Sequence, residues 1–131
     1  FIFTTSFPPS IAAGARTSIN YLKNSSLERD KMHERVSIIK DKLSQKHLPL
    51  IHNDSHIIPI IIGDPVLTKK VTDQLLNDFS IYVQPINYPT VPKGTERLRI
   101  TVSPLHTQSD IDHLVESLDA IWKEMKIARA A

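Results

Sequence analysis

The sequence predicts an α/β chain of the α+β type, in which helices cover one side of a small, mostly antiparallel three-stranded sheet. Four stretches carry apolar residues at helical spacing, and three short runs are β-prone. The last two of these runs are separated by only one loop, which favours an antiparallel pair. The chain has 131 residues, 40% of them apolar, which is enough for one domain with its own core.

Two helices are predicted in the first third of the chain. Ser10 is a candidate cap for the first, and Ser25 with Glu28 forms a capping-box pattern for the second. The second helix is expected to end near His47, because Pro49 follows. Whether the two helices form one long bent element stays open. Their expected inner faces are Ile11, Ala15, Ile19 and Leu22, then Met32, Val36, Ile39 and Leu43.

A strand and a third helix are predicted next. The run from His56 to Gly63 is apolar and β-branched, so it is expected to be a strand that is buried on both faces. Pro59 cannot donate to a ladder, which places this strand at an edge or at a bulge. Asp64 and Pro65 then begin a helix. Its expected inner face is Leu67, Val71, Leu75 and Phe79.

The stretch 81–103 carries the functional signal. Residues 81–84 are β-prone, and in 97–102 the apolar residues alternate with Arg97, Arg99 and Thr101. Four loop-forming residues between these runs stiffen the connection, namely Pro85, Pro89, Pro92 and Gly94. A guanidinium held on a strand beside a rigid loop suits a carboxylate or phosphate, because it donates two parallel hydrogen bonds. The pattern therefore predicts an anion site at Arg99, with solvated edge charges as the alternative.

The last predicted helix begins at Thr107, which is expected to cap it, with Asp110 in the first turn. A broad apolar stripe follows, made of Ile111, Leu114, Val115, Leu118, Ile121, Trp122 and Met125. Such a stripe is typical of a core helix.

Composition and motifs argue against several classes of function. The net charge is +2 with mixed signs, so we expect no nucleic-acid partner and no membrane partner. The absence of cysteine excludes disulfides and thiolate metal sites, and no histidines pair with acidic residues at metal-ligand spacing. No nucleophile elbow or glycine-rich phosphate loop is present.

Three segments of the chain resemble a known family. YVQPINYPTVPKGTERLRI resembles the C-terminal segment of the α-oxoamine synthases, which are fold-type-I enzymes dependent on pyridoxal 5'-phosphate. FIFTTSFPPSIAAGA and SHIIPIIIGDP resemble the same family in the same order. The likeness covers essentially the whole chain. Ile86, Asn87 and Tyr88, which precede Pro89 and Thr90, favour the branch that forms 5-aminolevulinate.

The resemblance implies a homodimer that condenses glycine with succinyl-CoA to 5-aminolevulinate, CoA and carbon dioxide, in tetrapyrrole and haem biosynthesis. By that likeness Arg99 would hold a substrate carboxylate, Thr90 would contact the succinyl carboxylate and Ile86 would line the same pocket. Thr4 or Thr5 would bond the cofactor phosphate of the partner subunit, and which of them does so stays open. Bacterial cytoplasm and mitochondrial matrix both fit this family.

The resemblance also implies that the chain is one part of a longer enzyme. The family holds its cofactor through a lysine, and the lysines here match no such motif, so we expect no catalytic residue in this chain and no turnover by it alone. Residues 1–25 would be the end of the large domain with a connecting helix, and residues 26–131 the small domain. Two alternatives stay open. One is a sister synthase that makes 8-amino-7-oxononanoate or 2-amino-3-ketobutyrate, and the other is a non-catalytic α/β ligand-binding module.

Overall fold

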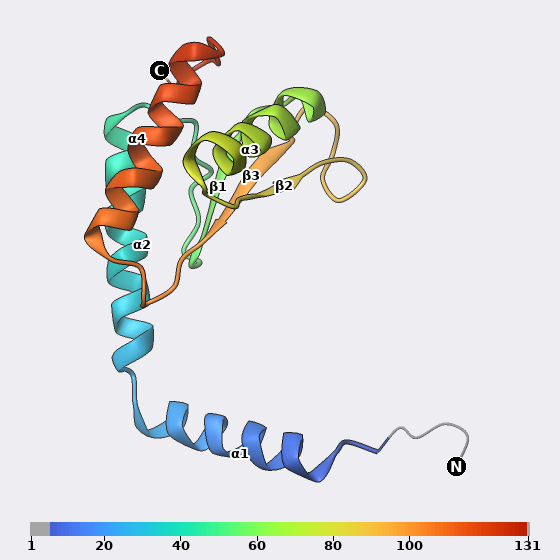
Figure 1. Cartoon of the computed structure of the whole chain (residues 1–131), viewed down its shortest axis with the longest axis vertical. Coiled ribbons are helices and arrows are strands. Elements are labelled where there is room, and N and C mark those ends of the chain that lie inside the picture. Colours follow the sequence, from blue (N-terminus) through green and yellow to red (C-terminus); the bar gives the residue numbers. More distant parts are fainter. Residues whose placement is uncertain (1–5, 131) are drawn as a thin grey trace.

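The structure, a computed structural model, describes residues 6–130 and contains four helices and three strands within that range. In chain order the elements are α1 (Pro9–Asn24), α2 (Leu27–Gln45), β1 (Ile57–Ile61), α3 (Pro65–Phe79), β2 (Gln84–Ile86), β3 (Arg97–Thr101) and α4 (Gln108–Glu124). Figure 1 shows α2 and α4 side by side next to the sheet, with α3 across it and α1 extending away. The order of helices and strands is the predicted one.

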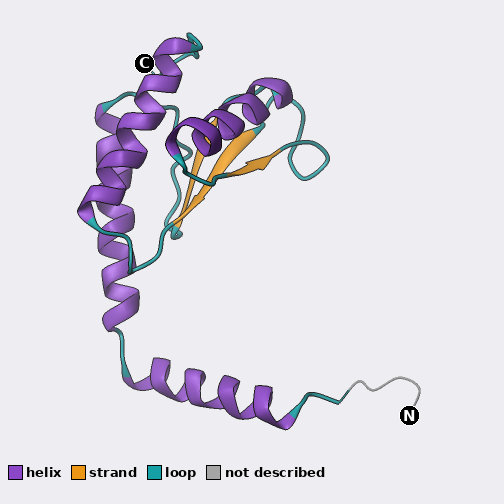
Figure 2. Cartoon of the chain, viewed as in Figure 1, coloured by secondary structure: helices purple, strands orange, loops and turns teal. Residues whose placement is uncertain are grey.

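The sheet is antiparallel throughout, with the strand order β1-β3-β2. β3 is therefore the central strand. Arg99 stands opposite Pro59 of β1 on one side and Gln84 of β2 on the other. Pro59 and Pro85 both lie in edge strands, where the missing N–H of proline does not interrupt a ladder. The three antiparallel strands, with α2 and α4 beside them and α3 across them (Figure 2), confirm the predicted fold class.

One hydrophobic core lies between the sheet and the helices α2, α3 and α4. Alternate residues of β3 and β1 point into it, so Leu98, Ile58 and Ile60 are fully buried. The helices contribute the buried side chains Val36, Ile39, Leu43, Val71, Leu75, Ile111, Val115, Leu118, Ile121 and Trp122. These positions repeat at helical spacing, as the sequence predicted.

The opposite face of the sheet has no helix over it within the described residues. Ile57, Pro59 and Ile61 are half-buried there, so β1 is not buried on both faces as predicted. The β-branched sequence of β1 is typical of a strand that is buried on both faces, but the outer face of β1 is only partly covered. Arg97, Arg99 and Thr101 of β3 lie on the same outer face. This open face carries the candidate site.

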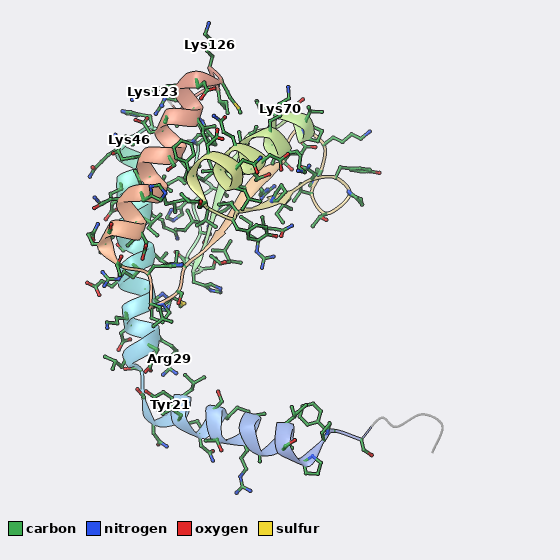
Figure 3. All side chains as sticks on the ribbon, viewed as in Figure 1. Tyr21, Arg29, Lys46, Lys70, Lys123 and Lys126 are labelled. Carbon is green, nitrogen blue, oxygen red and sulfur yellow. The ribbon has the colours of Figure 1, made fainter. Side chains whose placement is uncertain are left out.

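Helix α1 forms but packs differently from the prediction. None of its residues is buried, and Ile11, Ile19 and Leu22 are all exposed. Its junction with α2 is held by Tyr21 Oη, which donates to Glu28 Oε1 at 2.6 Å, and by Arg29 Nη1, which donates to Leu22 O at 2.7 Å. Figure 3 shows Tyr21 at this junction, next to the start of α2, while the rest of α1 extends away from the sheet. The predicted apolar residues do lie on α1, but no described residue covers them.

Several local boundaries differ from the sequence expectation. α1 follows Pro8 rather than a Ser10 cap, and α2 begins after Ser26, with Ser25 contacting Glu28 through its side chain. β2 occupies 84–86 instead of 81–84, because the chain is still leaving α3 at Ile81, whose N–H bonds Leu75 O. Long-range pairing with β3 decides which residues become the strand.

α3 begins at Pro65 as predicted, with Asp64 as its cap, and Thr107 caps α4 as predicted. Asp64 Oδ1 accepts from Leu67 N at 2.6 Å. Thr107 and Asp110 form a complete capping box. Among the described helices none is long and apolar enough to cross a membrane.

Candidate functional site

The central strand β3 places Arg99 on the open face of the sheet. Leu98 and Ile100 point into the core, so the period of two residues directs Arg97 and Arg99 to the other side. Arg99 is exposed, and no described residue forms a hydrogen bond or an ion pair with it. Arg97 is half-buried, and its Nε donates to Thr95 O at 2.9 Å. Of the two arginines, Arg99 is the one whose guanidinium makes no hydrogen bond or ion pair within residues 6–130.

The loop between β2 and β3 is held in place by its own polar contacts. The buried carboxylate of Glu96 accepts from Gly94 N at 2.9 Å, and Thr95 Oγ1 donates to Pro92 O at 2.7 Å. Gly63, at φ +80°, lies so close to the loop that a Cβ there would be 3.2 Å from Gly94 O. A side chain at position 63 would therefore press against the loop and meet an unfavourable backbone conformation.

Thr90 sits in a turn of this loop, where its N–H donates to Asn87 O at 3.0 Å. Asn87 ties the same turn to the start of α3, because its Nδ2 donates to Pro65 O at 3.3 Å. The Thr90 side chain is exposed and none of its bonds within the described chain uses the hydroxyl. A hydroxyl presented in this way is available to a ligand.

A cavity of about 370 Å³ brings the predicted substrate-binding residues together. Arg99, Thr90 and Ile86 all line it, and we call it the loop cavity. It is also lined by Asn53, Ser55, Ile57, Pro59 and Arg97. No acidic residue of the described chain lines it, so the charge near Arg99 favours an anion.

Asn53 and Ser55 were missed by the sequence analysis, which assigned neither an element nor a function to residues 50–55. Asn53 Oδ1 accepts from both Ser55 N at 3.0 Å and Ser55 Oγ at 2.7 Å, so the segment is a closed turn. The Asn-Asp-Ser sequence predicts such a turn, but not its position opposite the loop that carries Thr90. That position follows from the pairing of β1 with β3.

A second, larger cavity of about 650 Å³ lies on the other side of Arg99. It is bounded by the segment 80–84, the end of β3 and the first turns of α4, and we call it the helix cavity. Arg99 and Ile86 line both cavities. The sequence analysis gave no sign of this cavity, because its lining comes from several segments that are distant in the chain, Ile39 of α2 among them.

Asp110 and His106 lie at the mouth of the helix cavity. The hydrogen bonds from the backbone and side chain of Thr107 lower the pKa of Asp110. His106 Nδ1 accepts from Ser103 N at 3.1 Å, so the neutral ring carries its proton on Nε2.

Thr4 and Thr5, the predicted cofactor-phosphate ligands, lie outside the described residues, so their role stays a prediction. Within residues 6–130, no three histidine or acidic side chains are grouped in a way that holds a metal ion.

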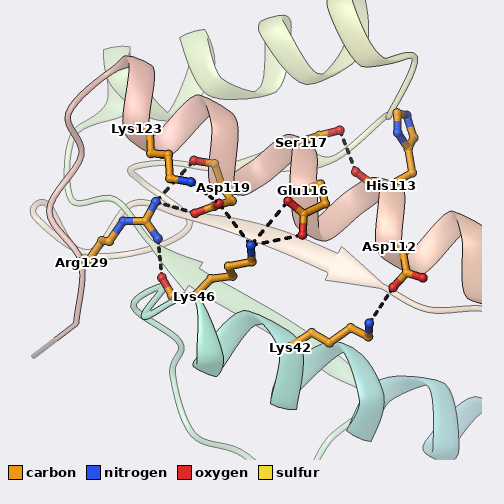
Figure 4. Close-up of polar contacts among 9 residues, drawn as sticks. All are labelled: Lys42, Lys46, Asp112, His113, Glu116, Ser117, Asp119, Lys123 and Arg129. Atoms are coloured by element: carbon orange, nitrogen blue, oxygen red, sulfur yellow. Dashed lines mark hydrogen bonds and ion pairs between the residues drawn. The ribbon is translucent and has the colours of Figure 1, made fainter.

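Away from these cavities, a cluster of charges joins α2, α4 and the C-terminal segment (Figure 4). Asp119 is at its centre, with a side chain only 4% exposed. Its carboxylate lies 2.7 Å from Lys123 Nζ, 2.7 Å from Arg129 Nη2 and 3.3 Å from Lys46 Nζ. Arg129 also donates to Lys46 O, and Glu116 pairs with Lys46 at 3.1 Å. This cluster fastens the end of the chain to the helical layer.

A family model described as aminotransferase class I and II matches residues 1–118. The chain belongs to the class I and II aminotransferase family.

Among curated relatives, the chain is 54% identical over 130 residues to 5-aminolevulinate synthase of Rhizobium meliloti, a match that covers 99% of this chain and 32% of the relative. It is 50% identical over 131 residues to the mitochondrial 5-aminolevulinate synthase of Neurospora crassa, which covers 100% of this chain and 21% of the relative. The chain therefore spans a third or less of the length of these relatives. The predicted resemblance is confirmed.

Solved structures of this fold agree. Serine palmitoyltransferase from S. paucimobilis matches with a TM-score of 0.86 at 27% identity, over 95% of this chain and 31% of that one. 8-Amino-7-oxononanoate synthase from Francisella tularensis matches with a TM-score of 0.78 at 25% identity, over 95% of this chain and 36% of that one. Both likenesses extend over nearly the whole chain, α1 included.

Proposed function

We propose that this chain is the substrate-carboxylate-binding, C-terminal part of a 5-aminolevulinate synthase. The complete enzyme would be a homodimer that condenses glycine with succinyl-CoA. The convergence of Arg99, Thr90 and Ile86 on one cavity carries the proposal, together with 54% identity to a named synthase. Residues 1–25 would lie with the large domain, which fits the complete exposure of α1, and residues 26–131 would be the small domain.

Arg99 would bind the carboxylate of glycine. Its guanidinium projects from a central strand, has no partner among the described residues and borders a cavity without acidic groups. A planar guanidinium donates two parallel hydrogen bonds to a carboxylate, which fixes both the position and the orientation of a small amino acid. Orientation of the substrate is a large part of what an enzyme supplies.

Thr90 would donate its hydroxyl to the succinyl carboxylate, and Ile86 would form the apolar wall beside the succinyl chain. The turn at Asn87–Thr90 and the Glu96–Gly94 contact keep this loop in position. An apolar wall excludes water and strengthens the neighbouring charge-assisted hydrogen bonds.

Pyridoxal 5'-phosphate would serve the complete enzyme as the electron sink at the α-carbon of glycine. The described residues do not fit its covalent attachment, because no lysine lines the loop cavity or the helix cavity. Lys42, Lys46 and Lys69 are instead engaged in ion pairs, and Lys93 lies over the ring of Tyr88. The cofactor would therefore be held by other parts of the enzyme, with Thr4 or Thr5 at its phosphate across the dimer.

Arg99→Lys in the complete enzyme tests this proposal. Lysine keeps the charge but loses the two-pronged geometry, so the affinity for glycine should weaken by about 1–2 kcal/mol, or roughly 5- to 30-fold. Steady-state kinetics with varied glycine measures the change in KM. Arg29→Lys is the matched control, since Arg29 lines neither cavity and its hydrogen bond among the described residues goes to Leu22 O.

An unchanged glycine KM in Arg99→Lys, with normal turnover, would remove Arg99 from the substrate site. Activity with pimeloyl or acetyl donors in place of succinyl-CoA would assign the enzyme to a sister branch. The complete protein is expected in the bacterial cytoplasm or the mitochondrial matrix, since relatives of both origins match this chain.

A further inference from the structure

Glu96 is a carboxylate at a position where the sheet otherwise buries apolar side chains. It directly precedes β3, and the inward-facing series continues with the buried residues Leu98 and Ile100. Glu96 is itself only 1% exposed. Within residues 6–130 it forms no ion pair, whereas the other buried carboxylate, Asp119, faces three basic side chains. Burial of a carboxylate without a cation costs free energy, so the presence of Glu96 calls for a reason other than stability.

The hydrogen bond of the Glu96 carboxylate lies inside the loop that carries Thr90. Its Oε2 accepts from Gly94 N at 2.9 Å. Gly94, at φ +81°, stands in a turn that is closed by Thr95, whose N–H donates to Pro92 O at 3.1 Å. One residue separates this turn from Thr90. A displacement of the turn would therefore displace the Thr90 hydroxyl as well.

The main chain of Glu96 ties the same turn to the end of β1 independently of the carboxylate. Its carbonyl accepts from Ile62 N and Gly63 N, each at 2.9 Å. Replacing the side chain therefore removes the contact with Gly94 N while the backbone stays fastened to the sheet. Glu96 lines neither the loop cavity nor the helix cavity, so a ligand in either would not touch it.

We propose that Glu96 is a positioning residue that determines donor specificity: by holding Gly94 N–H, it places the Thr90 hydroxyl where the terminal carboxylate of the acyl-CoA donor binds. This role rests on the proposed function, in which Thr90 binds the succinyl carboxylate, and adds a residue that touches no substrate. Because Glu96 acts through Thr90, its loss should affect a donor with a terminal carboxylate and leave the affinity for glycine unchanged.

Glu96→Leu in the complete enzyme separates this role from a structural one. Leucine continues the buried apolar series, and replacing a buried charge by a well-packed apolar group is often neutral or stabilising. Thermal stability should therefore be kept. The KM for succinyl-CoA should nevertheless rise about ten-fold, the effect of losing a hydrogen bond to a charged group. The KM for glycine should stay within about two-fold, and kcat/KM for butyryl-CoA, which has no terminal carboxylate, should not change.

Thr90→Val completes a double-mutant cycle with Glu96→Leu. Valine lacks the hydroxyl, so this variant alone should raise the KM for succinyl-CoA. Adding Glu96→Leu should then raise it little further, because both changes break the same interaction. Glu96→Gln keeps an acceptor oxygen for Gly94 N and should hold the KM within about five-fold of the native value. Glu96→Ala also lacks the acceptor and repeats the test should the leucine variant fail to fold.

Asp119→Asn is the control for stability. Asp119 is also a buried carboxylate, but it lines neither cavity. Its replacement should therefore destabilise the enzyme and leave the KM values for glycine and succinyl-CoA unchanged.

The role of Glu96 and the proposed function fail separately. If Thr90→Val raises the succinyl-CoA KM and a folded Glu96→Leu does not, the role of Glu96 is overturned and the proposed function stands. Equal losses with succinyl-CoA and butyryl-CoA, or fully additive effects in the cycle, would have the same meaning. An unchanged succinyl-CoA KM in Thr90→Val would instead overturn the proposed contact of Thr90, and the role of Glu96 with it.

Discussion

Asp119 and Arg99 are both charged residues of this domain, and they differ in every other respect. Asp119 is almost fully buried, and its carboxylate meets Lys46, Lys123 and Arg129. Arg99 is exposed and meets no charged group among the described residues. The charge of Asp119 is paired inside the protein. The charge of Arg99 has no partner among the described residues and lies where two cavities meet.

The difference shows how this fold divides its charges between stability and binding. A buried carboxylate requires partners, because desolvation penalises an unpaired charge. An exposed guanidinium remains hydrated, so it carries almost no desolvation penalty and can stay unpaired until a ligand binds. We therefore expect changes at Asp119 to alter the stability of the chain and changes at Arg99 to alter its affinity for anions.

The largest expected effect is that of Asp119→Asn on stability. The amide keeps the shape but removes the charge that three cations face, so the free energy of unfolding should fall by about 2 kcal/mol. Urea denaturation of the 131-residue chain measures it. Glu116→Gln is the matched control: Glu116 also pairs with Lys46, but its side chain is 67% exposed, so the change should stay below about 0.5 kcal/mol. Equal losses in the two variants would contradict the central role of Asp119.

The stabilisation that the Asp119 carboxylate provides depends on pH. The hydrogen bond from Lys123, followed by those from Arg129 and Lys46, lowers the pKa of Asp119 from 3.8 to about 2. The folded chain thus binds fewer protons at this group than the unfolded chain, so the stabilisation is complete above about pH 4 and is lost as the pH falls toward 2. Denaturation of the native chain and of Asp119→Asn at pH 6, 4, 3 and 2.5 measures the difference in stability between them.

That difference should shrink steadily below about pH 4. The neighbouring carboxylates Asp110 and Asp112, whose pKa values are also lowered, are present in both proteins and cancel in the comparison. A difference that stays constant from pH 6 to pH 2.5 would show that the charge of Asp119 is not what stabilises the cluster.

The smallest expected effect is that of Arg99→Gln on stability. Because the guanidinium has no partner to lose within the described chain, the free energy of unfolding should change by less than about 0.5 kcal/mol. Urea denaturation again provides the measurement. A loss comparable with that of Asp119→Asn would mean that Arg99 is a structural residue, and the contrast between the two sites would disappear.

Part of the site follows directly from local pattern. The alternation around Arg97 and Arg99 predicts which side chains leave the core, and β3 has that pattern of burial. The loop residues near Thr90 predict a turn, and the structure has one. The caps at Asp64 and Thr107 were likewise readable, because a cap depends on residues within one helical turn.

Other features depend on segments that are far apart in the chain. β2 was predicted over residues 81–84 but spans Gln84–Ile86, and β1 was expected to be buried on both faces. The Asp119 cluster and the helix cavity were not predicted at all. The cluster joins Lys46 to residues 70 or more positions away, and no local pattern records such a contact.

The sequence by itself determined the order of the elements, the inward faces of the helices around the core and the outward position of Arg99, because hydrophobic periodicity and capping act over a few residues. Only the tertiary structure decided that β3 is the central strand and that Arg99 lines two cavities. It also decided that Asp119 forms ion pairs with three basic side chains. These outcomes depend on which distant surfaces pack together. That choice is made by the burial of the whole core and not by any single segment.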